Sequence, residues 1–270
     1  MIAHETDAAV AAAEATSLVV GDLRVEFDGF VAVGGVSFDA HVGEVRFLIG
    51  PNGAGKTTCI DAITGLSKGT GSVRLGDVEV LGKPVHKVTR LGIGRTFQTA
   101  SVFDELTVMQ NLDIAAGIHR PSATLLRARR VVPRPVERAL VDVGLEAHRS
   151  TPAGILSHGQ KQWLEIGMLL VQNPRALLLD EPVAGMSHDE RTETGKLLQR
   201  IAERRIVLVV EHDMDFMRRF ATRVTVLHQG KVLSEGSVAD VQADPRVQEV
   251  YLGTAAAVAA TGDDIATEEA

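Results

Sequence analysis

The chain has 270 residues, of which 45% are hydrophobic and 23% charged, and its formal net charge is −7. This length is enough to bury a core in one large α/β domain or in two small ones, and the negative charge argues against nucleic acid as the main partner. A single cysteine, Cys59, excludes an intramolecular disulfide, and no apolar run approaches the ~18 residues that a membrane-spanning helix needs.

The two ends of the chain differ from its middle. Residues 1–16 and 254–270 are rich in alanine, and the second stretch is also acidic. The first stretch lacks the basic start and the apolar block of a signal peptide. Segments of this composition bury little apolar surface, so we expect two disordered tails around a folded part at residues 17–253.

The folded part begins with three predicted strands. Residues 18–26, 36–42 and 44–49 have the alternating or continuous apolar character of strands. Phe27 and Phe30 lie between the first two. An aromatic side chain at this place can stack on a nucleotide base or pack in the core, and the residues alone leave both roles open.

A glycine-rich loop follows the third strand and precedes a predicted helix. Small residues let the backbone turn its N–H groups inward at a helix N-terminus, where they bind phosphate oxygens. Lys56 supplies a positive charge for the phosphates, and the hydroxyl of Thr57 can take one position around Mg²⁺. We interpret Cys59, in the helix, as a small core residue and not as a reactive thiol. The stretch has the spacing G-x-x-x-x-G-K-T of a phosphate-binding loop and consists of Gly50, Pro51, Asn52, Gly53, Ala54, Gly55, Lys56, Thr57 and Thr58.

The middle of the chain changes from short mixed elements to helices. Residues 71–80 predict a hairpin, residues 84–90 a short helix, and residues 93–98 a strand that ends at Gln98. The amide of Gln98 can reach a metal ion or a water molecule, which by itself is weak support for a site.

A helical insertion into the α/β body is predicted next. Between residues 99 and 156 the stretches 108–118 and 135–143 have helical periodicity. A basic cluster at residues 127–130 lies between these helices. Its composition favours a solvated loop over a surface that faces lipid head groups.

Residues 156–160 open another predicted helix. Ser157 is a candidate N-cap with Gln160 three residues later, which is the capping-box pattern. A helix N-terminus that carries Ser157 and Gly159 is a ready anion site. A capped helix without any ligand explains the same residues equally well.

Two apolar strands of the second half end in residues with acid–base chemistry. Residues 176–181 end in Asp180 and Glu181, and residues 206–210 are followed by Glu211 and His212. Runs that are apolar throughout are typical of parallel strands buried on both faces. Asp180 can then hold Mg²⁺ and Glu181 can polarise an attacking water, and His212 shares their edge if the two strands are parallel neighbours. The remaining predicted elements are a hairpin at 224–235 and short helices at 238–243 and 247–252.

These motifs together resemble those of one known family. Residues 50–57, Gln98, residues 156–160, residues 178–181 and His212 follow the order of the Walker A, Q-loop, signature, Walker B and H-loop motifs of ABC transporter nucleotide-binding domains. The resemblance covers about residues 18–253. It implies an α/β fold in which an ABC-type P-loop ATPase core carries an antiparallel β subdomain and an inserted helical subdomain at about residues 99–156.

The resemblance also implies a chemistry. Glu181 resembles the general base, His212 the residue that contacts the γ-phosphate, and Gln98 a ligand of Mg²⁺ or of water. Phe27 matches the aromatic residue that stacks on adenine. Two such domains would close head to tail on two ATP molecules with Mg²⁺, and each ATP would also contact the signature of the other chain, here Ser157, Gly159 and Gln160.

Two positions depart from the general family pattern. His158 replaces the usual glycine of the signature, and Ser187 replaces the usual aspartate that follows residues 184–186. The bulkier His158 is tolerable if it points away from the phosphate-facing loop. Ser187 argues against a cross-dimer contact made by an aspartate, so we expect the communication between two sites to differ here.

A narrower likeness concerns the transported solute. Residues 157–168, 181–186 and 244–253 are similar to the ATPase subunits of urea transporters, within the branched-chain amino acid (LivG-type) group. The segment around Trp163 and the C-terminal stretch favour urea over leucine, whereas residues 184–186 are shared by both. We therefore expect an ATP-hydrolysing subunit of a urea importer, with a branched-chain amino acid importer as the alternative.

Such a subunit implies transmembrane permease subunits, a second ATPase subunit (identical or a sister), an external solute-binding protein, no nucleic acid, and a peripheral place on the cytoplasmic face of the membrane. Two other classes are weaker. A soluble ABC ATPase of translation or DNA repair is disfavoured because the chain has one ATPase domain, no long coiled-coil insertion and no basic surface. A catalytically inactive regulatory subunit is disfavoured by the intact Lys56, Asp180, Glu181 and His212.

Overall fold

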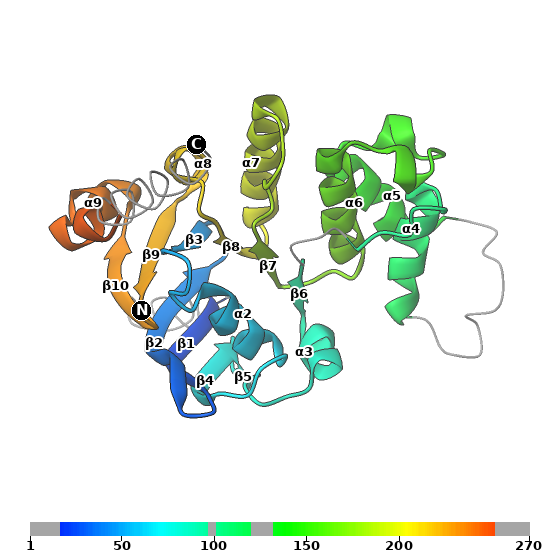
Figure 1. The fold of residues 1–270 in the computed structure, drawn as a ribbon. Coiled ribbons are helices and arrows are strands. Elements are labelled where there is room, and N and C mark those ends of the chain that lie inside the picture. The colour runs from blue at the N-terminus through cyan, green and yellow to red at the C-terminus, as the bar shows by residue number, and fades with distance from the viewer. Residues whose placement is uncertain (1–16, 97–100, 120–131, 252–270) are drawn as a thin grey trace, which may run out of the picture.

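A computed structural model describes residues 17–96, 101–119 and 132–251 (Figure 1). The two predicted tails, the basic cluster at 127–130 and Gln98 lie outside the described residues. Within them, no helix combines the length and the apolar character that crossing a bilayer demands.

One part of the fold is an antiparallel sheet with the strand order β2-β1-β4-β5. Asp28 and Gly29, with φ of 47° and 86°, form a tight turn that pairs Phe27 with Phe30. The second strand therefore starts at Phe30, six residues earlier than the predicted start at residue 36. The strands are β1 (Ser17–Phe27), β2 (Phe30–His41), β4 (Thr70–Leu75) and β5 (Val78–Glu79).

A second sheet of six strands has the order β10-β9-β3-β8-β7-β6. Pairing is parallel from β9 through β3, β8 and β7 to β6, and only the edge strand β10 is antiparallel to its neighbour. Every residue of β3, β7 and β8 is buried, as expected for apolar strands covered on both faces. The strands are β3 (Val45–Ile49), β6 (Ile93–Arg95), β7 (Ala176–Asp180), β8 (Ile206–Val210), β9 (Arg223–His228) and β10 (Lys231–Gly236).

Helices cover the six-stranded sheet on both faces. Helix α2 packs between the two sheets, because its buried Cys59, Ile60 and Ile63 share one apolar cluster with β1, β2 and β8. The other face packs against α7 and α8 through a second cluster, which includes Leu198 and Phe216. The bounds are α2 (Lys56–Thr64), α3 (Val85–Leu91), α7 (His188–Ala202), α8 (Met214–Phe220) and α9 (Val238–Ala243), with further helical residues at 245–251.

Three helices form a separate group beside the sheets, at the right of Figure 1. Gly167 of α6 lies close to Leu112 of α4 and to Val143 after α5, and a Cβ at Gly167 would be 3.1 Å from the Leu112 side chain. The group therefore includes α6, which the predicted boundary at residue 156 left in the core. Its elements are α4 (Val108–Ala115), α5 (Arg134–Asp142) and α6 (His158–Val171), with 3₁₀ turns at Ala116–His119, Glu146–His148 and Ala153–Ile155.

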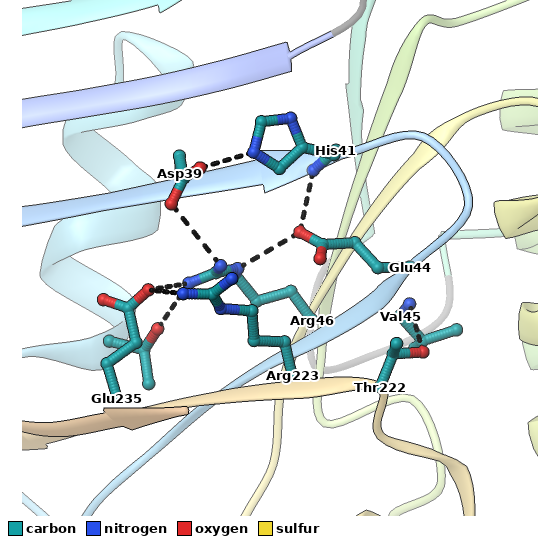
Figure 2. A network of polar contacts seen from close by, with 9 residues as sticks. Asp39, His41, Glu44, Val45, Arg46, Thr222, Arg223 and Glu235 are labelled. Carbon is teal, nitrogen blue, oxygen red and sulfur yellow. Dashed lines mark hydrogen bonds and ion pairs between the residues drawn. The ribbon is translucent and has the colours of Figure 1, made fainter. Parts of the chain in front are cut away.

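A buried arginine joins the two sheets (Figure 2). The Arg46 side chain on β3 has no exposed surface, and it donates hydrogen bonds of 2.9 Å to Thr225 on β9 and 2.9 Å to Glu235 on β10. It also lies 3.6 Å from Asp39 on β2 and 3.5 Å from Glu44 in the turn before β3. A cation without solvent contact needs such partners, so the position of each of these strands depends on the guanidinium.

We expect Arg46→Ala to lower the free energy of unfolding by about 3 kcal/mol, because it leaves the surrounding carboxylates without their buried cation. Urea denaturation followed by circular dichroism measures the change. Arg74→Ala is the matched control: Arg74 is half exposed and its pair with Asp77 is 3.7 Å long, so we expect a loss within about 0.5 kcal/mol. Equal losses in the two variants would contradict the role given to Arg46.

Candidate nucleotide-binding site

The parallel register brings the predicted site residues to one edge of the six-stranded sheet. Val210, the last residue of β8, pairs with Leu48 on β3 and with Asp180 on β7. The glycine-rich loop leaves β3 at this edge, Glu181 follows β7, and Glu211 and His212 follow β8. The prediction that His212 shares an edge with the two acids is therefore confirmed.

The glycine-rich loop is shaped by two glycines that have no room for a side chain. At Gly50 (φ 152°) a Cβ would lie 2.2 Å from the Leu227 carbonyl oxygen, and at Gly55 (φ 97°) it would lie 2.6 Å from that of Ala32. Gly55 has left-handed backbone angles at the N-cap of α2. These positions favour glycine because other residues are strained there, and they direct the loop onto the N-terminus of α2, the geometry of an anion site.

Lys56 lies over this loop. Its ammonium group donates to the carbonyl oxygens of Gly50, at 2.8 Å, and of Pro51, at 3.0 Å. Burial lowers the pKa of Lys56, while the charges of Glu181 and Asp180 act to raise it. The positive charge of Lys56 therefore interacts both with the carbonyl oxygens of the loop and with the two acids at the C-terminal end of β7. Thr57 is exposed and Thr58 half-buried in the first turn of α2.

Asp180 is buried, and only one of its two oxygens has a hydrogen-bond partner among the described residues. Arg95 lies 3.2 Å from Oδ2 of Asp180 and also pairs with Asp61 of α2. Oδ1 of Asp180 has no such partner in the part of the chain that the structure describes. Burial raises the pKa of Asp180, Arg95 opposes that rise, and Glu181 and Asp61 add to it. Within the described residues, no group of three or more His, Cys, Asp or Glu side chains is arranged to hold a metal ion. The fit to Mg²⁺ therefore rests on Oδ1 of Asp180, a hard oxygen that could bind the ion directly or through water.

Glu181 and His212 lie next to each other in front of this edge. The Oε1 of Glu181 is 3.5 Å from Nδ1 of His212, whose side chain is 62% exposed. Glu181 has a φ of 51°, which is uncommon for a residue with a side chain and is often found at functional sites. Its N–H donates to the Val210 carbonyl at 2.9 Å, so the strained turn is fixed to β8.

Two residues of this edge received no functional role in the sequence analysis, which did not mention Arg95 and only noted the position of Glu211. Arg95 holds Asp180, as described above. Glu211 is buried and accepts hydrogen bonds from the N–H groups of Val183, His212 and Asp213. Burial raises the pKa of Glu211, and these three N–H groups oppose the rise. Glu211 could have been predicted as a site residue because it directly follows the buried strand β8. No sequence pattern predicts that Arg95 pairs with Asp180.

The signature turn, residues 157–160, lies at the start of α6 and not at this edge. Ser157 caps α6 and forms the predicted capping box with Gln160, and both hydrogen bonds of the box are present. Gly159 is buried. No hydrogen bond or ion pair between described residues joins the signature turn to the glycine-rich loop of the same chain. The two elements lie at separate places in the fold, at the start of α6 and at the start of α2.

The two departures from the family pattern have local explanations. The exposed His158 side chain lies next to Gly185, where a Cβ would be 3.6 Å from Cδ2 of His158. Ser187 is the N-cap of α7 and forms a capping box with Glu190. A serine thus stabilises the start of α7 at the place where the family carries an aspartate.

Phe27 lies at the surface and not in the core. It is 48% exposed at the end of β1, and Phe30 across the turn is 69% exposed. The core alternative for both residues is therefore wrong, and about half of Phe27 is open to solvent. Gln98 lies outside the described residues, so its proximity to Asp180 stays a prediction.

The fold and the site define a P-loop nucleotide-binding protein of the ATP-binding cassette class. A family model described as ABC transporter matches residues 33–184, more than half of the chain, and one described as branched-chain amino acid ATP-binding cassette transporter matches residues 231–257. The chain belongs to the ABC transporter ATP-binding family, whose members are ATPases that drive transport. The predicted fold class is confirmed.

Several known proteins are similar to this one over nearly the whole chain. The high-affinity branched-chain amino acid transport ATP-binding proteins BraF of Pseudomonas aeruginosa and LivG of Escherichia coli are each 35% identical, over 251 and 250 residues, and the matches cover 88% of this chain and 98% of each relative. A crystal structure of an ATP-binding cassette of an ABC transporter in its ADP conformation has a TM-score of 0.76 at 30% identity, covering 87% of this chain and 98% of that one.

We expect Cys59 to resist thiol reagents in the folded protein. Complete burial raises the pKa of this thiol to about 12, so thiolate, the reactive form, is nearly absent at pH 8. Absorbance with a disulfide reagent at pH 8 should detect almost no reaction in buffer and one thiol per chain in 6 M urea. Equal rates under both conditions would show that the helix after the loop is open to solvent.

Proposed function

We propose that this chain is the ATP-hydrolysing subunit of an ABC importer for branched-chain amino acids. The observation that supports the chemistry best is the gathering of Lys56, Asp180, Glu181 and His212 at one edge of a parallel sheet. The cargo rests on the relatives BraF and LivG and on the family match at residues 231–257.

ATP binds, in this proposal, to the glycine-rich loop. The N–H groups of residues 52–58 surround the β- and γ-phosphates, and Lys56 exchanges its two carbonyl partners for phosphate oxygens. The accessible ring of Phe27 stacks on adenine. Thr57 and Asp180, together with Gln98, would hold Mg²⁺, which would supply positive charge next to the β- and γ-phosphates.

Hydrolysis then uses the residues in front of β7 and β8. Glu181 accepts a proton from the attacking water, and its strained backbone keeps the carboxylate facing the nucleotide. His212 contacts the γ-phosphate and limits the positions open to that water. Arg95 is a positioning residue, since it holds Asp180 without facing the phosphates. Together these groups orient reactants and stabilise charge, as phosphoryl transfer requires.

A second ATPase subunit completes each site. The signature turn of one chain, with Ser157, Gly159 and Gln160, covers the γ-phosphate bound to the loop of the other. The separation of loop and signature turn within one chain supports this arrangement. Permease subunits in the membrane and an external solute-binding protein complete the importer, which places this chain peripherally on the cytoplasmic face.

The transported solute separates two versions of this proposal. The sequence alone favoured urea, on the segment around Trp163 and the C-terminal stretch. The relatives favour the alternative, because the C-terminal residues 231–257 match a branched-chain amino acid cassette. The surface that selects the solute would lie in the partners and not in this ATPase subunit.

We expect Glu181→Gln to lower the rate of ATP hydrolysis by about 100-fold or more, because the amide cannot accept the proton of the attacking water. The variant should retain ATP and elute from gel filtration as a dimer when ATP is present. Glu193→Gln, an exposed acid paired with Lys196 on α7, is the control and should hydrolyse at the wild-type rate. Equal hydrolysis by wild type and Glu181→Gln would exclude Glu181 as the base.

We expect cells that lack this chain to lose uptake of labelled leucine and to keep uptake of labelled urea. Reintroducing the wild-type gene should restore leucine uptake, whereas Lys56→Ala should not, because it removes the phosphate-binding charge. Loss of urea uptake alone would overturn the amino acid assignment. Unchanged uptake of both solutes would contradict both cargo assignments while the hydrolysis assay still tests the ATPase.

A further inference from the structure

The signature turn already holds an anion in this structure, and that anion is a side chain of the same protein. The hydroxyl of Ser157 donates a 2.8 Å hydrogen bond to Oε1 of Glu190, which is 33 residues away on α7. A Cβ placed on Gly159 would lie only 2.6 Å from the same oxygen. The carboxylate therefore lies directly against the glycine of the signature turn, in the space that the missing side chain leaves.

The other oxygen of Glu190 is fixed to the start of α7. Oε2 accepts hydrogen bonds from the N–H of Ser187, at 3.0 Å, and from its hydroxyl, at 2.9 Å. Hydrogen bonds hold the pKa of Glu190 below its usual value. The largest contributions come from the backbone N–H of Ser187 and the hydroxyl of Ser157, followed by Oγ of Ser187 and the N–H of Gly159. Glu190 is thus ionised at neutral pH and connects the helical group with the core.

A carboxylate in this position and a phosphate bound to another chain need the same donors. A serine hydroxyl has one proton to donate, so Ser157 cannot serve Oε1 of Glu190 and a phosphate oxygen together. Two anions at one helix N-terminus would also repel each other. The two occupants therefore exclude one another.

We propose that Glu190 occupies the phosphate position of the signature turn until a second chain brings its ATP, and that it is displaced when the two chains close. This inference rests on the proposed use of the signature turn by a second subunit. Glu190 is accordingly a positioning residue. While Glu190 occupies the signature turn, it weakens the binding of that turn to the ATP held by the other chain. Because Glu190 also contacts Ser187, its release would link closure of the two chains at Ser157 to a change in the turn at Ser187.

Glu190→Gln separates this role from folding. Glutamine serves in a capping box as well as glutamate does, so α7 keeps its start, but the amide lacks the charge that competes with phosphate. Asp189→Asn is the matched control, because it removes the same charge from the neighbouring residue, which is exposed and makes no described contact with the signature turn. Thermal unfolding should place all variants within a few degrees of the wild type.

The experiment measures ATP-driven dimerisation by sedimentation, in chains that also carry Glu181→Gln to prevent hydrolysis. We expect Glu190→Gln to lower the dimer dissociation constant about five- to tenfold, because a charge-assisted hydrogen bond is roughly twice as strong as a neutral one. Asp189→Asn should change it less than twofold. In chains with Glu181 intact, Glu190→Gln should lower the KM for ATP and leave kcat within about twofold.

The possible results distinguish the role of Glu190 from the proposed use of the signature turn by a second chain. Equal dimerisation with and without the Glu190→Gln change, weaker dimerisation with it, or an equal gain from Asp189→Asn would overturn the role of Glu190 and leave the proposed function in place. No ATP-driven association in any variant would contradict the use of the signature turn by a second copy and would overturn this inference with it.

Discussion

The parallel pairing of β3, β8 and β7 is the constraint on which the site depends. Its register sets the ends of three buried strands level with one another, so that Leu48, Val210 and Asp180 face one edge. A slip by one residue would turn the side chains of a strand to its other face. Apolar packing on both sides prevents that slip, since Phe47 and Val209 enter one cluster while Leu48 and Val210 enter the other.

The same edge carries charges that burial would otherwise make unfavourable, and ion pairs or hydrogen bonds from neighbouring groups stabilise them. Asp180 is held by Arg95, and Glu211 by three backbone N–H groups. Lys56 interacts with the charges of Glu181 and Asp180, and its ammonium group donates hydrogen bonds to two carbonyl oxygens of the loop. In the proposed site, a nucleotide phosphate would bring negative charge to the lysine and a metal ion would bring positive charge to the acids, so binding would improve the charge balance on both sides.

Residues that act through local geometry were predicted from the sequence, and so was the shared edge of His212 with Asp180 and Glu181, because it follows from parallel strand pairing. Side-chain contacts between distant elements, such as that of Arg95 with Asp180, were not predicted. The loop, the capping box at Ser157 and the apolar strands follow from spacing within a few positions. Gly34 and Gly35 lie inside β2 and weaken its strand pattern, which explains the late predicted start. The capping box of Ser187 with Glu190 was equally visible in the sequence, but its contact with Ser157 depends on how the helical group sits against the core.

Polar bridges of modest strength connect α6 with α7. Trp163 donates to Thr194 at 2.8 Å, and Ser157 donates to Glu190 at the N-terminal ends of both helices. A single hydrogen bond contributes only about 1 kcal/mol net, whereas Gly167 and its neighbours pack α6 tightly against α4 and the end of α5. The apolar cluster that contains Leu164 of α6 also contains Leu197 and Leu198 of α7, so apolar packing and these polar bridges together hold the helical group against the core.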